Sequence, residues 1–266
     1  MFDRFNRRIN YLRVSVTDRC NLRCVYCMPA EGIKMLSHTD ILSYEEILEV
    51  IRVAVSMGVS KVRITGGEPL VRKGLVQFIS EVAAVPGILD LGLTTNGMLL
   101  EEFARPLALA GLHRINISLD TMDPDRFREI TRGGELSKVL LGIEAAQKAG
   151  LKPIKINCVI KDSSEEPDAA AVRSFCEDNG YEARFIHQMN LGEGCFTIVE
   201  NGHGGDCMHC NRLRLTANGR IKPCLFSDLE FDIRKMGIMP ALEAAVGLKP
   251  EKGTSNSSDF FHNIGG

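Results

Sequence analysis

Three cysteines lie within eight residues near the start of the chain, in the stretch RCNLRCVYC. Cys20, Cys24 and Cys27 have the spacing CxxxCxxC, and no fourth cysteine accompanies them. A structural zinc site uses four tetrahedral ligands, so three thiols are one too few. Three thiolates do suit a cubane 4Fe-4S cluster, because they bind three of its irons and leave the fourth open to a small molecule. The spacing therefore predicts a reactive iron-sulfur site, with half a zinc knuckle or buried free thiols as the alternatives.

A second group of three cysteines lies toward the other end of the chain. Cys207 and Cys210 form a CxxC pair, and Cys224 follows across a stretch that reads as a β-hairpin. This arrangement predicts a second cluster with an open iron. A structural zinc site is the alternative, because Cys195 or His203 could supply the fourth ligand.

Basic residues recur on the predicted strands, where alternation can aim them into a barrel. They are Arg13, Lys61, Arg63, Lys155, Arg184, Arg212 and Arg214. A barrel interior rarely tolerates unpaired cations, so their number predicts an anionic ligand. Arg212 and Arg214 are two residues apart and point to the same face, where their guanidinium forks suit a polyphosphate. A solvated hairpin face is the alternative for this pair.

The composition excludes several classes of partner. With 32 basic and 34 acidic residues and a pI near 6.3, the chain as a whole is not built for nucleic acid or an anionic membrane. Tryptophan is absent and aromatics make up 6%, against a base-stacking surface. The charged N-terminal stretch lacks the apolar core of a signal peptide, and no apolar run is long enough to span a bilayer. We therefore expect a cytoplasmic protein whose clustered cysteines bind metal rather than form disulfides.

Strand and helix patterns alternate through the first two thirds of the chain. The expected strands are 11–17, 61–65, 91–95, 114–119, 154–160 and 182–187. The expected helices are 43–57, 73–84, 100–110, 124–131, 137–149 and 167–179, the first opened by a capping box of Ser43 and Glu46. Six βα units predict an α/β fold, a partial (βα)6 barrel with parallel strands. We expect this barrel to occupy residues 1–190 and a small C-terminal domain with the second cluster to occupy residues 191–266.

Polar residues follow the expected strands at their carboxyl ends, where barrel chemistry is located. The segment Gly66-Gly67-Glu68-Pro69 follows the second strand, and Thr94, Ser118 and Met189 lie at the ends of later ones. CxxxCxxC followed by GGEP resembles the signature of radical S-adenosylmethionine (SAM) enzymes. The resemblance implies a barrel of that type, in which SAM chelates the open iron of the first cluster. It also implies that SAM contacts Gly66, Gly67, Glu68, Thr94, Ser118 and Met189.

Five motifs and the two terminal glycines resemble the GTP 3′,8-cyclase family of molybdenum-cofactor biosynthesis. The motifs are LRVSVTDRCNLRCVYCMP, VRITGGEPL, TTNG, NISLDT and CNRLRLTANGRIKPCLF. The enzymes of this family are radical SAM lyases that contain two 4Fe-4S clusters. The resemblance implies that a 5′-deoxyadenosyl radical takes hydrogen from the ribose 3′ carbon of GTP, and that the sugar radical then attacks carbon 8 of guanine. It implies that the purine binds the open iron of the second cluster.

The same resemblance assigns roles to individual residues. The seven strand-borne cations named above would bind GTP. Arg13 would also help quench the radical after ring closure, and Gly265 and Gly266 would be needed for radical transfer to GTP. Phe260, Phe261 and Ile264 are apolar enough to dock this tail on the protein.

The resemblance also implies partners, and one feature departs from it. A low-potential electron donor of flavodoxin or ferredoxin type would reduce the first cluster, and cyclic pyranopterin monophosphate synthase would receive the product. A homodimer is compatible with the family.

The stretch 190–206 is short for the family, because only these residues separate Met189 from Cys207. A diverged enzyme acting on another nucleotide or a peptide is therefore an alternative, and a metal-stabilised binding module is a third.

Overall fold

The computed structural model describes the chain except residues 195, 258–263 and 265–266. Its six N-terminal strands are parallel and lie side by side in the order of the sequence. They are β1 (Tyr11–Ser15), β2 (Lys61–Thr65), β3 (Asp90–Thr95), β4 (Arg114–Ser118), β5 (Ile154–Ile160) and β6 (Glu182–His187). The strands predicted from the sequence are confirmed with small shifts at their ends.

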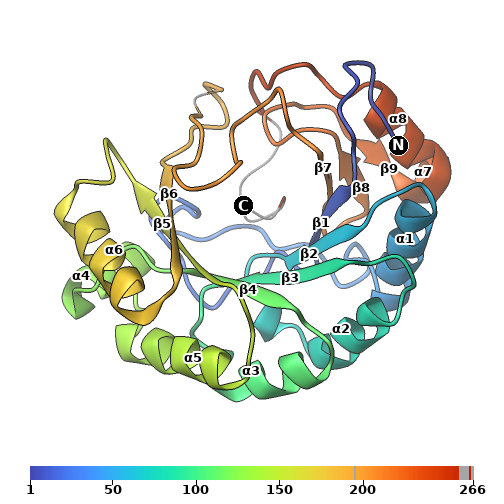
Figure 1. Ribbon diagram of the computed structural model, residues 1–266. Helices are drawn as coiled ribbons and strands as arrows, with labels where there is room; N and C mark the ends of the chain where they lie inside the picture. The colour runs from blue at the N-terminus through green and yellow to red at the C-terminus, as the bar shows by residue number, and fades with distance from the viewer. Residues whose placement is uncertain (195, 258–263, 265–266) are drawn as a thin grey trace.

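Helices cover the outer, convex side of this curved sheet (Figure 1). They are α1 (Tyr44–Ser56), α2 (Leu75–Ala83), α3 (Leu100–Leu109), α4 (Pro124–Thr131), α5 (Leu136–Lys148) and α6 (Pro167–Asn179). The predicted capping box at α1 is present, since Ser43 accepts a hydrogen bond from the Glu46 amide and donates its own amide to the Glu46 carboxylate. A short 3-10 helix, η1 (Pro69–Val71), follows the GGE turn.

The C-terminal segment extends the same sheet. The hairpin predicted around the second cysteine group is confirmed as β7 (Arg212–Leu215) and β8 (Arg220–Lys222), and β9 (Phe231–Asp232) follows. β7 pairs in parallel with β1, so strands from both sides of the predicted boundary at residue 190 belong to one nine-stranded sheet. Two helices, α7 (Ile233–Met236) and α8 (Ile238–Gly247), complete this segment.

The two faces of each barrel strand have different chemistry. In β1, Leu12 and Val14 are fully buried, and together with their counterparts on the other strands they belong to the hydrophobic core. The alternate residues, Tyr11, Arg13 and Ser15, face the interior of the barrel. The apolar side stabilises the fold, and the polar side is free to line a site.

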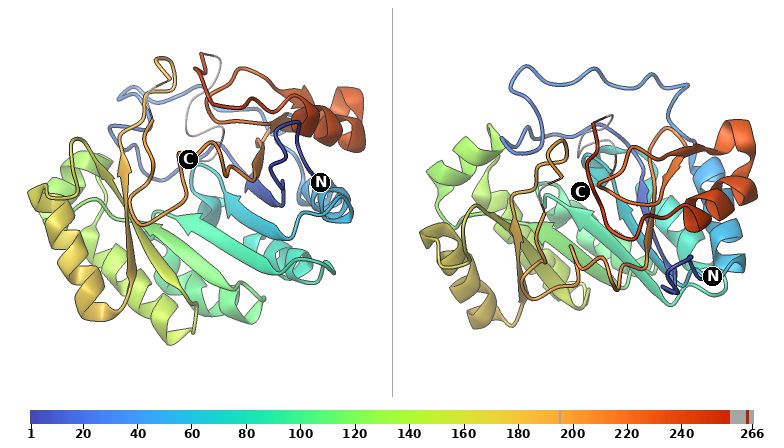
Figure 2. Two further views of the ribbon diagram at one scale, coloured as in Figure 1. Left: turned by 45° about the horizontal axis from the view of Figure 1, so that its top comes forward. Right: turned by 90° about the horizontal axis from the view of Figure 1, so that it is seen from above.

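The barrel is open, because β6 and β9 are the two edge strands of the sheet and do not pair with each other. The connection that follows β6 crosses this opening, as Figures 1 and 2 show, and reaches β6 through a bridge between Phe185 and Glu200. Within the described part of the chain, no helix has the length and apolar character needed to cross a membrane.

Candidate functional site: two thiol cavities joined by buried cations

The first three cysteines line one cavity of about 150 Å³ at the carboxyl ends of the strands. β1 leads into the loop that carries them, so the strand sets the position of all three thiols. Among the residues predicted to contact SAM, the same cavity is lined by Gly66, Gly67, Thr94 and Ser118. Sequence positions from four strands therefore meet at one place, as the sequence predicted.

Gly66 and Gly67 are required by the protein's own backbone. A Cβ atom on Gly67 would lie 2.4 Å from the carbonyl oxygen of Arg19, and one on Gly66 would lie 2.8 Å from that of Thr17. The Gly67 amide donates a hydrogen bond to Thr17 O at 2.7 Å, which holds the GGE turn against the cysteine loop. The two glycines are therefore needed first for the close contact between two protein segments.

Glu68 points its carboxylate into the protein. The side chain is 1% exposed and accepts hydrogen bonds from Thr95 Oγ1, the Asn96 amide and the Leu70 amide at 2.7–3.0 Å. The bonds from Thr95 and Asn96 connect the turn after β2 to the end of β3, and the bond from Leu70 lies within the turn itself. Glu68 itself is not among the residues that line the cavity, although the sequence predicted that it contacts SAM, and its amide donates a hydrogen bond to Arg19 O at 2.8 Å. Its side chain therefore stabilises the wall of the cavity.

The thiols of the first cavity resist ionisation in the protein alone. Burial, together with Asp120 and the neighbouring thiols, raises the pKa of Cys24 to about 12, and burial and Cys20 raise the pKa of Cys27 to about 12. Three thiolates at this place would need compensating positive charge, which the irons of a cluster supply. Thr94 Oγ1 is buried and, among the described residues, has no hydrogen-bond partner, so it is available to a ligand such as SAM.

The second cysteine group lines another cavity, of about 140 Å³. Cys207, Cys210 and Cys224 surround it together with three arginines: Arg13, Arg212 and Arg214. The hairpin returns Cys224 beside the CxxC pair, as predicted. The side chain of His203 is exposed, and Cys195, the other suggested fourth ligand, lies outside the described residues.

A buried lysine beside this cavity was not predicted from the sequence. Lys249 is 1% exposed, and its ammonium donates hydrogen bonds to Arg212 O at 2.8 Å and to Pro223 O. It thereby joins the two strands of the hairpin close to the cysteines. Burial raises the pKa of Cys210, but Lys249 and Arg212 outweigh it, so the pKa is lowered to about 7. No local pattern marks Lys249, because its role depends on a contact 37 residues away in the chain.

Arg7 was also missed and fixes the second cysteine loop from the N-terminal side. Its guanidinium forms a buried ion pair with Asp3 at 2.6 Å. It donates further hydrogen bonds to the carbonyl oxygens of Cys207, Pro250 and Glu251 at 2.7–2.8 Å. Both ends of the chain therefore hold the second cavity in place.

Strand register brings the predicted arginines together. Arg13 lies opposite Arg63 of β2 on one side and opposite Arg214 of β7 on the other. Burial and the neighbouring cations lower the pKa of Arg13, and they lower that of Arg214 to about 10. A row of arginines that destabilise one another's charge is the expected signature of a site for an anion.

Three other predicted cations lie on strands that line the same interior. Lys155 pairs with Glu182 on the neighbouring strand, and Lys61 is level with Tyr11 of β1. Arg184 is half-buried, and its Nε atom has no hydrogen-bond partner among the described residues. The register therefore places all seven predicted cations on barrel strands whose side chains alternate into the interior.

Two residues in this row were overlooked. Arg114 of β4 continues the arginine row and forms a two-bond ion pair with Asp90 at 2.5 and 2.7 Å. Tyr11 lies among Arg63, Arg13, Arg114 and Arg212, which overcome the effect of burial and lower its pKa. Alternation along β1 and β4 was the signal that could have found both residues.

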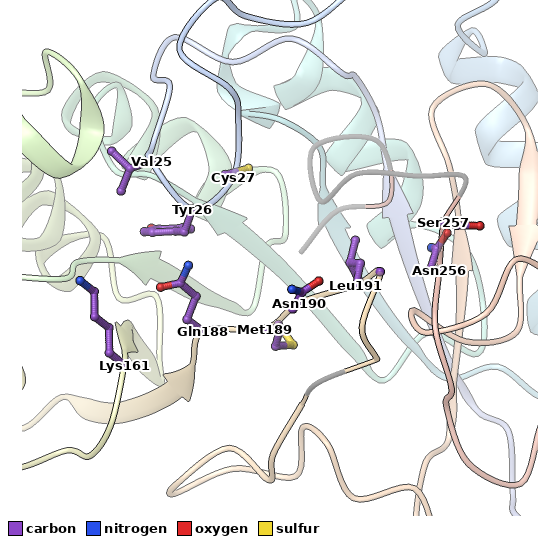
Figure 3. A pocket seen from close by; sticks show the side chains of 11 residues that line it. Val25, Tyr26, Cys27, Lys161, Gln188, Met189, Asn190, Leu191, Asn256 and Ser257 are labelled. Atoms are coloured by element: carbon purple, nitrogen blue, oxygen red, sulfur yellow. The ribbon is translucent and has the colours of Figure 1, made fainter.

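A larger cavity of about 870 Å³ opens between the two thiol sites. Figure 3 shows Cys27 and Tyr26 on one side and Asn256 and Ser257 of the C-terminal segment on the other. Met189, predicted to contact SAM, lines this cavity and the second thiol cavity but not the first. Cys27 lines both this cavity and the first thiol cavity, so the large cavity adjoins both thiol sites.

Ile264 is the part of the predicted tail that the structure describes. It is fully buried in a small cluster with Leu191, Leu225 and Phe226, which packs against Met189 and Cys224. The predicted docking residues Phe260 and Phe261 and the catalytic candidates Gly265 and Gly266 lie outside the described residues. The chain thus reaches the second thiol site one residue before its terminal glycines.

Known proteins match this chain along most of its length. The profile of the Radical SAM superfamily matches residues 14–171. A GTP 3′,8-cyclase of Thermodesulfovibrio yellowstonii is 43% identical over 282 residues, covering 89% of this chain and 88% of the relative. One of Geobacter sulfurreducens is 42% identical over 304 residues, covering 95% and 93%. The chain belongs to the GTP 3′,8-cyclase family of radical SAM enzymes.

This member of the cyclase family is short. The alignment with the Thermodesulfovibrio protein extends over 282 residues, whereas the present chain has 266. The relative therefore carries residues that have no counterpart here. Their predicted place, between β6 and Cys207, stays a prediction.

Solved structures share the barrel. Streptococcus suis SuiB bound to precursor peptide SuiA has a TM-score of 0.56 and 21% identity, covering 70% of this chain and 40% of that chain. Native anSMEcpe with bound AdoMet has a TM-score of 0.52 and 20% identity, covering 69% and 52%. At this identity the likeness concerns the fold alone, and it confirms a barrel of radical SAM type.

The cyclase family uses SAM and 4Fe-4S clusters, and the residues present fit both. Each thiol cavity offers three cysteines, the donor set that leaves one iron of a cubane cluster open. The unpartnered Thr94 hydroxyl lies beside the first set, and three arginines lie beside the second. The first site therefore suits SAM, and the second suits an anionic substrate.

Proposed function

We propose that this chain is a GTP 3′,8-cyclase, a lyase that performs the first step of molybdenum-cofactor biosynthesis. The observation that carries the proposal is the arrangement of two three-thiol cavities on either side of a large cavity, with a row of buried arginines beside the second. A nucleoside triphosphate has the length and charge to lie along this row, with its base at the second cavity.

When bound, SAM and the first cluster would supply a 5′-deoxyadenosyl radical, the reagent needed for the proposed removal of hydrogen from the ribose 3′ carbon of GTP. The chain's own residues determine where this occurs. Thr94 and Ser118, with the backbone of Gly66 and Gly67, would orient SAM against the first three cysteines. The buried fit between the GGE turn and the cysteine loop keeps these groups at fixed positions.

The cations would hold the substrate. Arg212 and Arg214 of β7 lie next to the cysteines, so they would bind phosphate oxygens with planar forks while the purine lies at the second cavity. Lys61, Arg63, Lys155 and Arg184 would neutralise the remaining phosphate charge. Arg13 lines the second cavity between the two arginine-bearing strands, where it would lie near the base. Gly265 and Gly266 are proposed to take part in radical transfer to GTP.

The deciding experiment is anaerobic turnover. Reconstituted protein is incubated with SAM, dithionite and GTP, and the products are separated by chromatography and mass spectrometry. We expect 5′-deoxyadenosine and a cyclised nucleotide from the parent and neither from Cys24→Ala. Formation of 5′-deoxyadenosine without a cyclised nucleotide would favour the alternative, a diverged enzyme that acts on another nucleotide or on a peptide. This alternative is the second candidate because the chain is short relative to its family.

The remaining partners belong to the same proposal. The first cluster would receive its electron from a low-potential donor of flavodoxin or ferredoxin type, and the product would pass to cyclic pyranopterin monophosphate synthase. A reducing cytoplasm suits a protein whose thiols must bind iron. The homodimer stays a prediction.

A further inference from the structure

A second large cavity lies outside the barrel and shares no lining residue with either thiol cavity. It measures about 710 Å³ and is bordered by the cysteine loop, the start of α1, the segment after η1 and the start of α7. Residues of the connection between β1 and α1, which arcs away from the sheet in Figure 2, form one side. We call this cavity the outer groove. None of the roles proposed above uses it.

Only the polypeptide of the cysteine loop separates the outer groove from the first cluster site. Thr17 and Arg19 line the groove, whereas Cys20, the next residue, lines the first thiol cavity. The loop has little thickness here, because Gly67 packs directly on Arg19 O and Asp18 O from the inner side. The groove is therefore the outer surface of the segment that would bind the first cluster.

The outer groove is basic. Its charged lining residues are four cations and one carboxylate, Glu46. The cations are Arg19, Arg72, Lys73 and Arg234. Glu46 is already engaged by Arg234 and by the Ser43 amide, so it offers little charge to a partner. The groove thus has a net positive charge on a chain whose overall charge is −2.

Two of these cations are fixed in position before any partner arrives. Arg72 donates hydrogen bonds to Val16 O at 2.5 Å and Leu42 O at 2.7 Å, and Arg234 donates to Thr39 O at 3.1 Å. The two hydrogen-bond partners of Arg72 are neutral carbonyls, so they orient its guanidinium without cancelling its charge, whereas Arg234 also forms an ion pair with Glu46. Lys73 and His38 are exposed at the edge of the groove, and the buried Arg19 Nε has no partner among the described residues. A preorganised basic surface favours an acidic partner and speeds its association.

We propose that the outer groove is the docking site of the reductant, a small acidic protein that carries single electrons. The proposal rests on the proposed function, because only a cluster that cleaves SAM needs this electron. The carrier is oxidised by one electron, and the first cluster is reduced by one. With SAM and substrate inside the barrel, the inner side of the cysteine loop is covered, so the outer side is the remaining short route to the cluster.

Lys73→Glu and the double change Lys73→Glu with His38→Glu test the proposal. Both side chains are exposed, and neither belongs to the proposed cofactor or substrate site. Arg105→Glu, exposed on the outer helix α3, is the matched control. The rate of 5′-deoxyadenosine formation is measured with dithionite and, separately, with a chemically reduced acidic flavodoxin at several concentrations and ionic strengths.

We expect kcat/KM for flavodoxin to fall at least about fivefold in Lys73→Glu and further in the double variant, with a weaker salt dependence than in the parent. Dithionite-driven rates should stay within about twofold, since a small reductant needs no docking surface. Unchanged flavodoxin kinetics in the double variant, or an equal loss with both reductants, would overturn the docking site. Absence of dithionite-driven SAM cleavage in the parent would instead overturn the proposed function.

Discussion

At the scale of the single residue, the environment of Glu68 predicts how the stability of the protein depends on pH. Burial outweighs the hydrogen bonds of the Glu68 carboxylate and raises its pKa to about 7. The unfolded chain releases this proton at a pKa of about 4.3. Between these two values the folded state therefore binds more protons than the unfolded state, and this group's contribution to stability falls as pH rises.

Glu68→Gln removes this titration and also replaces one acceptor oxygen with a donor. We expect the variant's loss of unfolding free energy to be largest near pH 5 and to shrink toward pH 7, by roughly 1.4 kcal/mol per pH unit at most. Urea unfolding of the cluster-free parent and variant at pH 5, 6 and 7 measures this difference in unfolding free energy. Glu49→Gln, exposed on α1, is the control. A loss that is the same at all three pH values would contradict the assignment.

Lys249 leads to another prediction for a single residue. Because Lys249 and Arg212 lower the pKa of Cys210 to about 7, Lys249→Met should raise that pKa toward the ordinary thiol value. Alkylation of Cys210 by iodoacetamide in cluster-free protein, followed by peptide mass spectrometry from pH 6 to 9, measures the change. Lys252→Met, exposed nearby, should leave the profile unchanged. Identical profiles for parent and Lys249→Met would show that Lys249 does not act on this thiol.

At the scale of the element, β7 decides how the arginines meet. Its parallel pairing with β1 sets Arg214 directly beside Arg13, which a solvated hairpin would not do. Arg214→Lys keeps the charge but loses the planar fork. We expect at least a tenfold weaker affinity for GTP by calorimetry, corresponding to a charged hydrogen bond of about 1.5–3 kcal/mol. SAM cleavage without GTP should persist, and Arg105→Lys on α3 should bind GTP like the parent. Parent-like GTP affinity in Arg214→Lys would mean that this guanidinium does not touch the ligand.

At the scale of the whole molecule, the two ends of the chain meet at the second thiol cavity. Arg7 reaches it from the N-terminal side, and Ile264 packs beside Cys224 from the C-terminal side. Removal of Gly265 and Gly266 should leave iron content and GTP-independent SAM cleavage largely intact while the cyclised product is lost. Ile264→Ala should give the same pattern, because it removes the buried side chain that anchors the tail. Normal product formation by the truncated protein would show that the tail is dispensable.

The sequence by itself determined the local elements and the two thiol groups. Alternation and capping at Ser43 and Glu46 depend on residues close together in the chain, so six strands and six helices could be predicted with small errors. The cysteine spacings depend on ligand chemistry and are equally local. The family could be identified for the same reason, since its motifs are short stretches.

Only the tertiary structure decided how these pieces meet. The pairing of β7 with β1 joins segments about 200 residues apart, and no local pattern specifies such a partner. Lys249 and Arg7 act through backbone carbonyls of distant residues, whose positions exist only in the folded chain. The need for glycine at position 67 likewise comes from Arg19 O, a neighbour in space. Local sequence patterns therefore predicted the two thiol sites. Long-range packing determined how close the sites lie, which charges surround them and the outer groove.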